Sequence, residues 1–198
     1  MPRFMWRWED HKKMRLPQDL LLILASVIFL AFTIGYFAYF RRPEGTPWPM
    51  RVLAILSGAT TGGIISEITD TRATWGSFVP ALTLLLLSAA LYGWAILTTR
   101  RQRLSLAFSG DAPDFLLAEG PYRLIRHPFY TAYLLYWLGG TIAARQPLLL
   151  LAVGVMAAGF AWAALREEAK FAASPLAANY AAYRRRTGMF LPWRIFGA

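Results

Sequence analysis

The residues with the clearest chemical potential form a short basic cluster just before an apolar segment. Arg123, Arg126 and His127 lie directly ahead of Pro128. Proline suits the first turn of a helix, because the N–H group that it lacks has no intrahelical partner there. The positive dipole end and the free N–H groups of that helix would face the same place as the basic side chains. The cluster predicts an anion-binding site, and the alternative is a basic loop whose arginines reach lipid phosphates.

A second cluster, Arg166, Glu167 and Glu168, follows the last long apolar run. A carboxylate near a helix C-terminus opposes the helix dipole, so it needs a cation or a hydrogen-bond donor nearby. Adjacent helical residues point about 100° apart, so only one glutamate is expected to face a pocket. We favour Glu168, with Glu167 pairing with an arginine, and expect alanine at the pocket position to leave the ligand-free protein as stable or more stable. The alternative is a solvated acidic helix end.

A third group of residues lies in the basic, aromatic tail. Ser174 and Pro175 are typical of a helix N-cap and first helical residue, and Gly188 is typical of a helix stop. Between them Tyr180 and Tyr183 recur at helical spacing. This pattern predicts a short amphipathic helix that lies at the membrane surface.

Long apolar runs must position these three clusters. Of the 198 residues, 57% are apolar and only 16% are charged, whereas soluble domains carry about 25% charged residues. Runs of roughly 20 apolar residues span a bilayer. The predicted fold is an all-α, polytopic transmembrane helix bundle with four strong spans, one weak span and a short interfacial C-terminal helix. The strong spans are expected at 18–40, 78–97, 128–144 and 147–165, and the weak span at 51–68.

The charge distribution bears on the orientation of the bundle. The net charge of +10 fits basic segments that meet anionic lipid on the cytoplasmic side, and nucleic-acid binding is not expected. If 51–68 does not span, the basic regions 1–17, 98–127 and 166–198 share one side and carry 16 of the 21 Lys and Arg residues. The positive-inside rule favours this layout, whereas hydropathy permits the layout in which 51–68 spans.

The sequence excludes several kinds of chemistry. It contains no cysteine and only two histidines. Disulfides, zinc–thiolate sites, iron–sulfur clusters and thiol nucleophiles are therefore ruled out, and no metal site is expected.

Taken in order, the clusters resemble a known family, the isoprenylcysteine carboxyl methyltransferases, and the related phospholipid N-methyltransferases. The motifs that carry the resemblance are Gly-Pro-Tyr-Arg-x-x-Arg-His-Pro-x-Tyr at 120–130, Arg-Glu-Glu at 166–168, Tyr-x-x-Tyr at 180–183 and Phe-Leu-Pro at 190–192. Ala132 and the pair at 176–177 stand where the family usually has Gly and Phe-Gly.

The resemblance implies an integral-membrane methyltransferase that uses S-adenosyl-L-methionine at the cytosolic ends of the last two spans. It divides the chain into a basic interfacial segment (1–17), N-terminal transmembrane helices (18–97) and a cofactor-binding region (98–198). The cofactor-binding residues that it implies are Tyr122, Arg123, Arg126, His127, Pro128, Tyr130, Glu167, Glu168, Tyr180 and Tyr183. Arg126 and Glu168 are the expected catalytic residues.

The methyl acceptor is expected to be a lipophilic molecule or lipid that enters from the bilayer. A carboxylate acceptor is already a nucleophile at neutral pH, whereas an amine must first lose a proton to a base. The sequence shows no dedicated base, which favours a carboxylate, with a phospholipid amine as the alternative. Two further alternatives remain: a catalytically silent subunit of a membrane-protein complex, and a membrane reductase of the sterol-reductase type.

Overall fold

The computed structural model describes residues 15–41, 45–100, 104–105 and 113–192. Most of these residues are helical, which confirms the predicted helix bundle. The elements are α2 (Arg15–Tyr39), β1 (Phe40–Arg41), α3 (Trp48–Asp70), α4 (Trp75–Thr99), β2 (Leu104–Ser105), η1 (Gly120–Arg123), α5 (Pro128–Ala144), α6 (Leu149–Ala172) and α7 (Ala177–Arg184). The two-residue strands β1 and β2 pair in parallel. Of the predicted interfacial segment 1–17, residues 1–14 lie outside the described residues.

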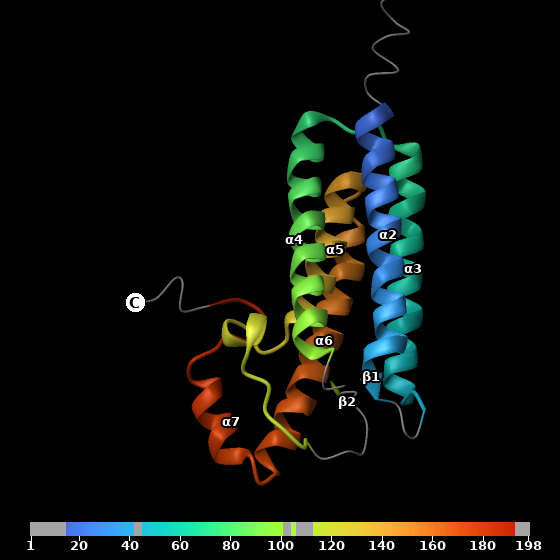
Figure 1. Ribbon diagram of the computed structural model, residues 1–198. Helices are drawn as coiled ribbons and strands as arrows, with labels where there is room; N and C mark the ends of the chain where they lie inside the picture. The colour runs from blue at the N-terminus through green and yellow to red at the C-terminus, as the bar shows by residue number, and fades with distance from the viewer. Residues whose placement is uncertain (1–14, 42–44, 101–103, 106–112, 193–198) are drawn as a thin grey trace, which may run out of the picture.

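Helices α2 to α6 run alternately up and down in one bundle, and α7 lies beside the lower end of α6 (Figure 1). In the part of the chain that is described, α2, α3, α4 and α6 are long and apolar enough to cross a membrane. The segment predicted to be a weak span therefore forms a full helix, α3. The start of α2 lies at the opposite end of the bundle from the start of α5 (Figure 1). This arrangement is the layout that hydropathy permitted, not the one that the positive-inside rule favoured.

The segment 128–144 was predicted to be a strong span, but α5 is not among the four long apolar helices. It has 17 residues, so it is about 26 Å long, and it lies in the middle of the bundle with most of its residues buried. Its apolar composition reflects contact with other helices. Gly139 and Gly140 allow a close approach, because a Cβ atom at Gly140 would lie 2.8 Å from Ile64 on α3.

Polar contacts fix how α5 sits against its neighbours. Trp137 donates from its indole N–H to the hydroxyl of Thr61 on α3 at 3.2 Å. The hydroxyl of Ser88 on α4 donates to the backbone carbonyl of Ala132 at 2.7 Å. In an apolar bundle, small residues and hydroxyl groups of this kind join helices. Together they hold the first turn of α5, and the basic cluster before it, in a fixed position.

Exposed tryptophans indicate where the two membrane boundaries are expected. Trp75 begins α4 and Trp94 lies near its end, and their side chains are exposed. Their separation of 19 positions corresponds to about 28 Å of helix, close to the roughly 30 Å thickness of the hydrocarbon core. Trp162 on α6 is also exposed, six residues before Glu168. Glu168 lies about 9 Å further along the helix, so the aromatic-belt pattern predicts that it lies on the aqueous side.

Candidate functional site

The motif at 120–130 folds against the last turn of α4. Gly120 has a φ of +54°, and a Cβ atom at this position would collide with the side chain of Thr98. Glycine is therefore required both for the backbone conformation and for the close approach. The 3-10 turn η1 follows, His127 is the N-cap residue of α5, and Pro128 is its first residue. The prediction that Pro128 opens a helix is confirmed.

The tail of the chain is paired with this motif through the backbone. The N–H of Arg126 donates to the carbonyl of Gly188 at 2.8 Å, and the N–H of His127 donates to the carbonyl of Met189 at 3.1 Å. The N–H of Gly188 donates in turn to the carbonyl of Leu124 at 3.2 Å. Gly188 was predicted to stop the tail helix, but α7 ends at Arg184 and Gly188 belongs to this pairing. The N–H groups of Arg126 and His127, which precede α5, therefore bind the tail and are not free for an anion.

Glu168 lies at the centre of a buried group of charges. Its Oε1 atom accepts a hydrogen bond from Nε of Arg126 at 2.8 Å and lies 3.4 Å from Nε2 of His127. Its Oε2 atom forms an ion pair with Arg184 at 3.3 Å. The side chains of Arg126, His127 and Glu168 are 8%, 7% and 5% exposed. The cations supply the compensation that a carboxylate in the last part of α6 requires.

Arg126 makes several structural contacts. Besides Glu168, its guanidinium donates to the backbone carbonyls of Thr187 and Arg184. It therefore joins α6, the motif and the tail, and it positions Glu168. It is not among the residues that line the hollow described below.

Glu167 contacts the other edge of the same histidine. Its Oε2 atom lies 3.4 Å from Nδ1 of His127, and its Oε1 atom accepts a hydrogen bond from the hydroxyl of Tyr130. The ring of Tyr130 stacks between His127 and Phe160. Neighbouring glutamates on one helix can both contact the motif because imidazole has a nitrogen on each of two edges. Sequence reasoning had paired Glu167 with an arginine.

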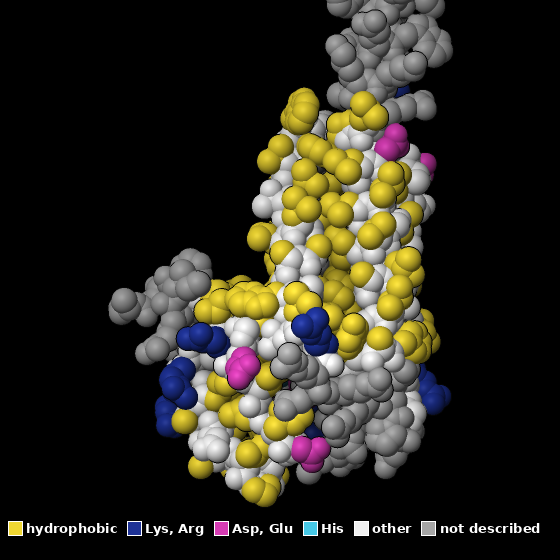
Figure 2. Space-filling model, in the orientation of Figure 1, with side chains coloured by type: hydrophobic (Ala, Val, Ile, Leu, Met, Phe, Trp, Pro, Cys, Tyr) yellow, Lys and Arg dark blue, Asp and Glu magenta, His cyan; other side chains and the backbone are white. Residues whose placement is uncertain are grey.

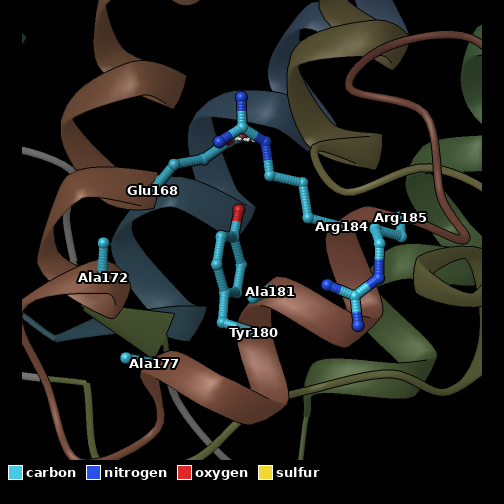
Figure 3. A pocket seen from close by; sticks show the side chains of 7 residues that line it. All are labelled: Glu168, Ala172, Ala177, Tyr180, Ala181, Arg184 and Arg185. Atoms are coloured by element: carbon cyan, nitrogen blue, oxygen red, sulfur yellow. Dashed lines mark ion pairs between the residues drawn. The ribbon is translucent and has the colours of Figure 1, made fainter.

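An open hollow of about 630 Å³ lies between the end of α6 and α7. Figure 3 shows the hydroxyl of Tyr180 pointing toward the ion pair of Glu168 and Arg184. Alanine side chains form the opposite part of the lining, which keeps the space open. The lining residues are Glu168, Ala172, Ala177, Tyr180, Ala181, Arg184 and Arg185. Of the two glutamates, only Glu168 lines the hollow.

The environment shifts the titration of several groups outside the spans. Burial lowers the pKa of His127, but hydrogen bonds and charge interactions with Glu167 and Glu168 outweigh burial and raise it above 6.5. For the phenols of Tyr122, Tyr180 and Tyr183 burial acts in the other direction and raises the pKa. These phenols therefore stay protonated at neutral pH. The site at neutral pH is therefore an arrangement of cations around one buried carboxylate.

The structure brings together most of the predicted site residues, although in two layers. Glu168 and Tyr180 line the hollow. Behind them lie Arg126, His127, Pro128 and Tyr122, as well as Tyr183, which donates from its hydroxyl to the carbonyl of Tyr122 at 2.8 Å, and the Tyr130–Glu167 pair. Arg123 is exposed and does not line the hollow.

Sequence reasoning missed the residues that shape the hollow on the side of α7. Ala177 and Ala181 recur at helical spacing, and Arg184 and Arg185 follow them. Spacing of four residues does place Ala177 and Ala181 on one helix face. Small side chains carry no chemical signal of their own, so only the packing of α7 against α6 shows that they line a space.

Comparison with known proteins finds a family that resembles part of the chain. Residues 77–174 match the family model described as phospholipid methyltransferase. The match starts in α4 and includes the motif, α5 and both glutamates. This stretch, 98 of the 198 residues, is similar to the phospholipid methyltransferase family. Helix α7 and the remainder of the tail lie beyond the matched stretch.

A curated relative adds little about function. Over 109 residues the chain is 37% identical to the cobalt-zinc-cadmium resistance protein CzcN of Cupriavidus metallidurans. The aligned stretch covers 54% of this chain and 50% of that protein, so the chain spans about half of the length of the relative. No solved structure matches the chain. Within the described residues, no group of three or more His, Cys, Asp and Glu side chains is arranged to hold a metal ion.

Proposed function

We propose that the chain transfers a methyl group from S-adenosyl-L-methionine to a lipophilic acceptor, and that the cofactor occupies the hollow between α6 and α7. The observation that carries the proposal is Glu168, a carboxylate that lines the hollow while cations from the motif and the tail hold it from behind. The similarity of residues 77–174 to the phospholipid methyltransferase family supports the reaction type.

The residues of the hollow fit the polar groups of this cofactor. Oε2 of Glu168 is buried and, among the described residues, has no hydrogen-bond donor, because Arg184 lies at 3.3 Å without hydrogen-bond geometry. An amine or a ribose hydroxyl group could supply that missing donor. Arg185 lines the same space and is exposed, so its guanidinium suits the carboxylate of the cofactor. The side chain of Arg184 is 60% exposed, so it can move aside at small cost.

The buried charges behind the hollow position the groups that bind. When bound, the cofactor supplies an electrophilic methyl group on a sulfonium centre. Arg126 and His127 fix the rotamer of Glu168, and Tyr183 fixes η1 through the carbonyl of Tyr122. Such fixed groups contribute by alignment, because methyl transfer requires the acceptor in line with the bond that breaks. The phenol of Tyr180 adds a neutral hydrogen-bonding group that faces the ion pair.

We favour a carboxylate as the methyl acceptor. Arg184 and Arg185 line the hollow with only one acidic residue, Glu168, so this side of the site attracts a negatively charged group. The second candidate is a phospholipid amine, which the description of the family supports. For that acceptor Glu167, which is 29% exposed and paired with His127, is the candidate proton acceptor.

We place the hollow on the cytosolic side of the membrane. The segments attached to this end of the bundle, 40–51, 98–127 and 166–198, contain 14 of the 21 Lys and Arg residues of the sequence. The segments at the other end contain seven. The positive-inside rule therefore supports a cytosolic site even with α3 as a span. A cytosolic cofactor would also reach the hollow directly.

Transfer of a labelled methyl group tests the proposal. Purified protein in vesicles would receive methyl-labelled S-adenosyl-L-methionine with either an isoprenylated cysteine carboxylate or an aminophospholipid. We expect label in the carboxylate product, and loss of at least about tenfold in rate for Glu168→Gln, since a charge-assisted contact of about 1.5–3 kcal/mol is removed. Arg186→Gln, a change at an exposed arginine outside the hollow, is the matched control.

The same experiment separates the alternatives. Label in the phospholipid amine only would replace the carboxylate proposal with the second candidate. Cofactor binding without transfer to either acceptor would support the silent-subunit alternative, and binding of NADPH in place of S-adenosyl-L-methionine would support the reductase alternative. Either of the last two results would refute the proposed function.

A further inference from the structure

The tyrosines of the tail helix face the protein. Tyr180 stacks on Phe171 of α6 with ring centroids 4.7 Å apart, and Tyr183 donates its hydroxyl hydrogen bond to η1. Both tyrosines are at most 6% exposed. The aromatic face of α7 therefore contacts the protein, and these two tyrosines do not contact lipid.

We call the region formed by η1, α7 and the tail up to residue 192 the lobe. A part of the lobe away from α7 presents apolar side chains to the outside. Leu124 follows η1 and is 42% exposed, and Leu191 lies in the tail and is 70% exposed. Their segments are joined through the backbone pairing of Leu124 with Gly188. We call Leu124, Leu191 and the exposed Arg123 the rim.

The rim lies at the level of a membrane boundary. Gly120, at the start of η1, lies against Thr98 of α4, and Thr98 donates its hydroxyl hydrogen bond to the carbonyl of Trp94. Trp94 is exposed and one helical turn, about 6 Å, from Thr98. Figure 1 shows η1 and the last described tail residues on the part of the lobe nearest the bundle, with α7 on the far part. Figure 2 shows hydrophobic side chains along this part, beside the bundle, and Lys or Arg side chains next to them.

We propose that the rim is a docking surface for the phospholipid bilayer, with Leu124 and Leu191 inserted below the headgroups and Arg123 paired with lipid phosphate. Two observations select this occupant. The rim continues the apolar surface of the spans, and its leucines are flanked by the exposed Arg123, a combination typical of interfacial segments. The rim thus holds the lobe that contains the hollow against the membrane surface.

Spin labels test this proposal independently of any methyl transfer. The sequence has no cysteine, so Leu124→Cys and Leu191→Cys each give one labelling site. The protein would be studied in vesicles of phosphatidylcholine and phosphatidylglycerol. Ala178→Cys, exposed on α7, is the aqueous control, and Leu151→Cys, 72% exposed on the span α6, is the bilayer control.

We expect the rim labels to collide more often with oxygen than with a water-soluble nickel chelate, as at Leu151 and opposite to Ala178. Raising the fraction of phosphatidylglycerol should deepen the label at Leu124, and Arg123→Gln should abolish that shift. Water-like collision rates at both rim sites would overturn the proposal. Low collision rates with both reagents would also overturn it, because they would show that another protein surface or a second copy covers the rim.

Discussion

Replacement of Glu168 by alanine should destabilise the ligand-free protein strongly. The variant removes the only carboxylate that pairs with Arg126 and leaves a guanidinium that is 8% exposed without its partner. His127 keeps one contact, to Glu167, and loses the other. An argument from the helix dipole alone predicts the opposite, since a carboxylate near a helix C-terminus is unfavourable by roughly 0.3–1 kcal/mol.

The two effects differ enough in size to decide the outcome. Removal of one partner of a buried ion pair costs about 3–5 kcal/mol, because a buried charge is left without compensation. Relief of the dipole returns at most about 1 kcal/mol. The net loss of about 2–4 kcal/mol corresponds to a fall in melting temperature of roughly 4–16 °C for a chain of this length. Glu167→Ala should cost less, about 1–2 kcal/mol, because its side chain is 29% exposed.

Thermal unfolding of the two variants in the same detergent measures this difference. Glu168→Gln keeps the shape of the side chain and should fall between Glu168→Ala and the wild type. A Glu168→Ala protein that melts at the wild-type temperature or higher would refute the reasoning. It would mean that Arg126 and His127 are solvated without the carboxylate and that the buried cluster does not hold the tail to the motif.

Three further predictions concern pH, packing and topology. The raised pKa of His127 adds stability below about pH 6.5 that is lost as the pH rises through the folded-state pKa; the difference in melting temperature between wild type and His127→Gln should shrink accordingly. Gly140→Ala should cost about 1–3 kcal/mol by overpacking, whereas Gly62→Ala, with open space around it, should not destabilise, as denaturant titrations would show. Single cysteines at Gln146 and Ala173 should react with impermeant reagents from opposite sides of the membrane; labelling from one side would contradict the bundle.

Much of the fold could be predicted because apolar runs report directly on helices that meet lipid. The segment 51–68 was harder, since Gly and Thr residues lower its hydropathy while its length still suits a span. Counting Lys and Arg residues favoured a layout in which this segment does not span. The positive-inside rule is a bias over all loops, however. With α3 as a span, 1–17 moves to the opposite side, but the other end of the bundle keeps its excess of Lys and Arg residues. The apolar segment 128–144 forms α5, and the sequence could not show that most of its residues are buried against protein, because burial in protein and burial in lipid select the same side chains.

The candidate site was predictable where residues carry charge. Arg126, His127 and both glutamates were identified from their types, and the structure places them within hydrogen-bond or ion-pair distance. The sequence did not reveal that the carbonyls of Gly188 and Met189 would bond to the motif, because backbone pairing between distant segments leaves no residue signature. Three of the seven residues that line the hollow are alanines, which spacing alone cannot distinguish from a packed helix face.

Binding of S-adenosyl-L-methionine to a hollow-blocking variant tests the central proposal most directly. Ala181 lines the hollow, whereas Ala178 is exposed on the same helix outside it. Calorimetry should detect saturable binding to the wild type and to Ala178→Trp, and no binding to Ala181→Trp at an unchanged melting temperature. Equal affinity of Ala181→Trp and the wild type would contradict the account, because a filled hollow could not then be the cofactor site.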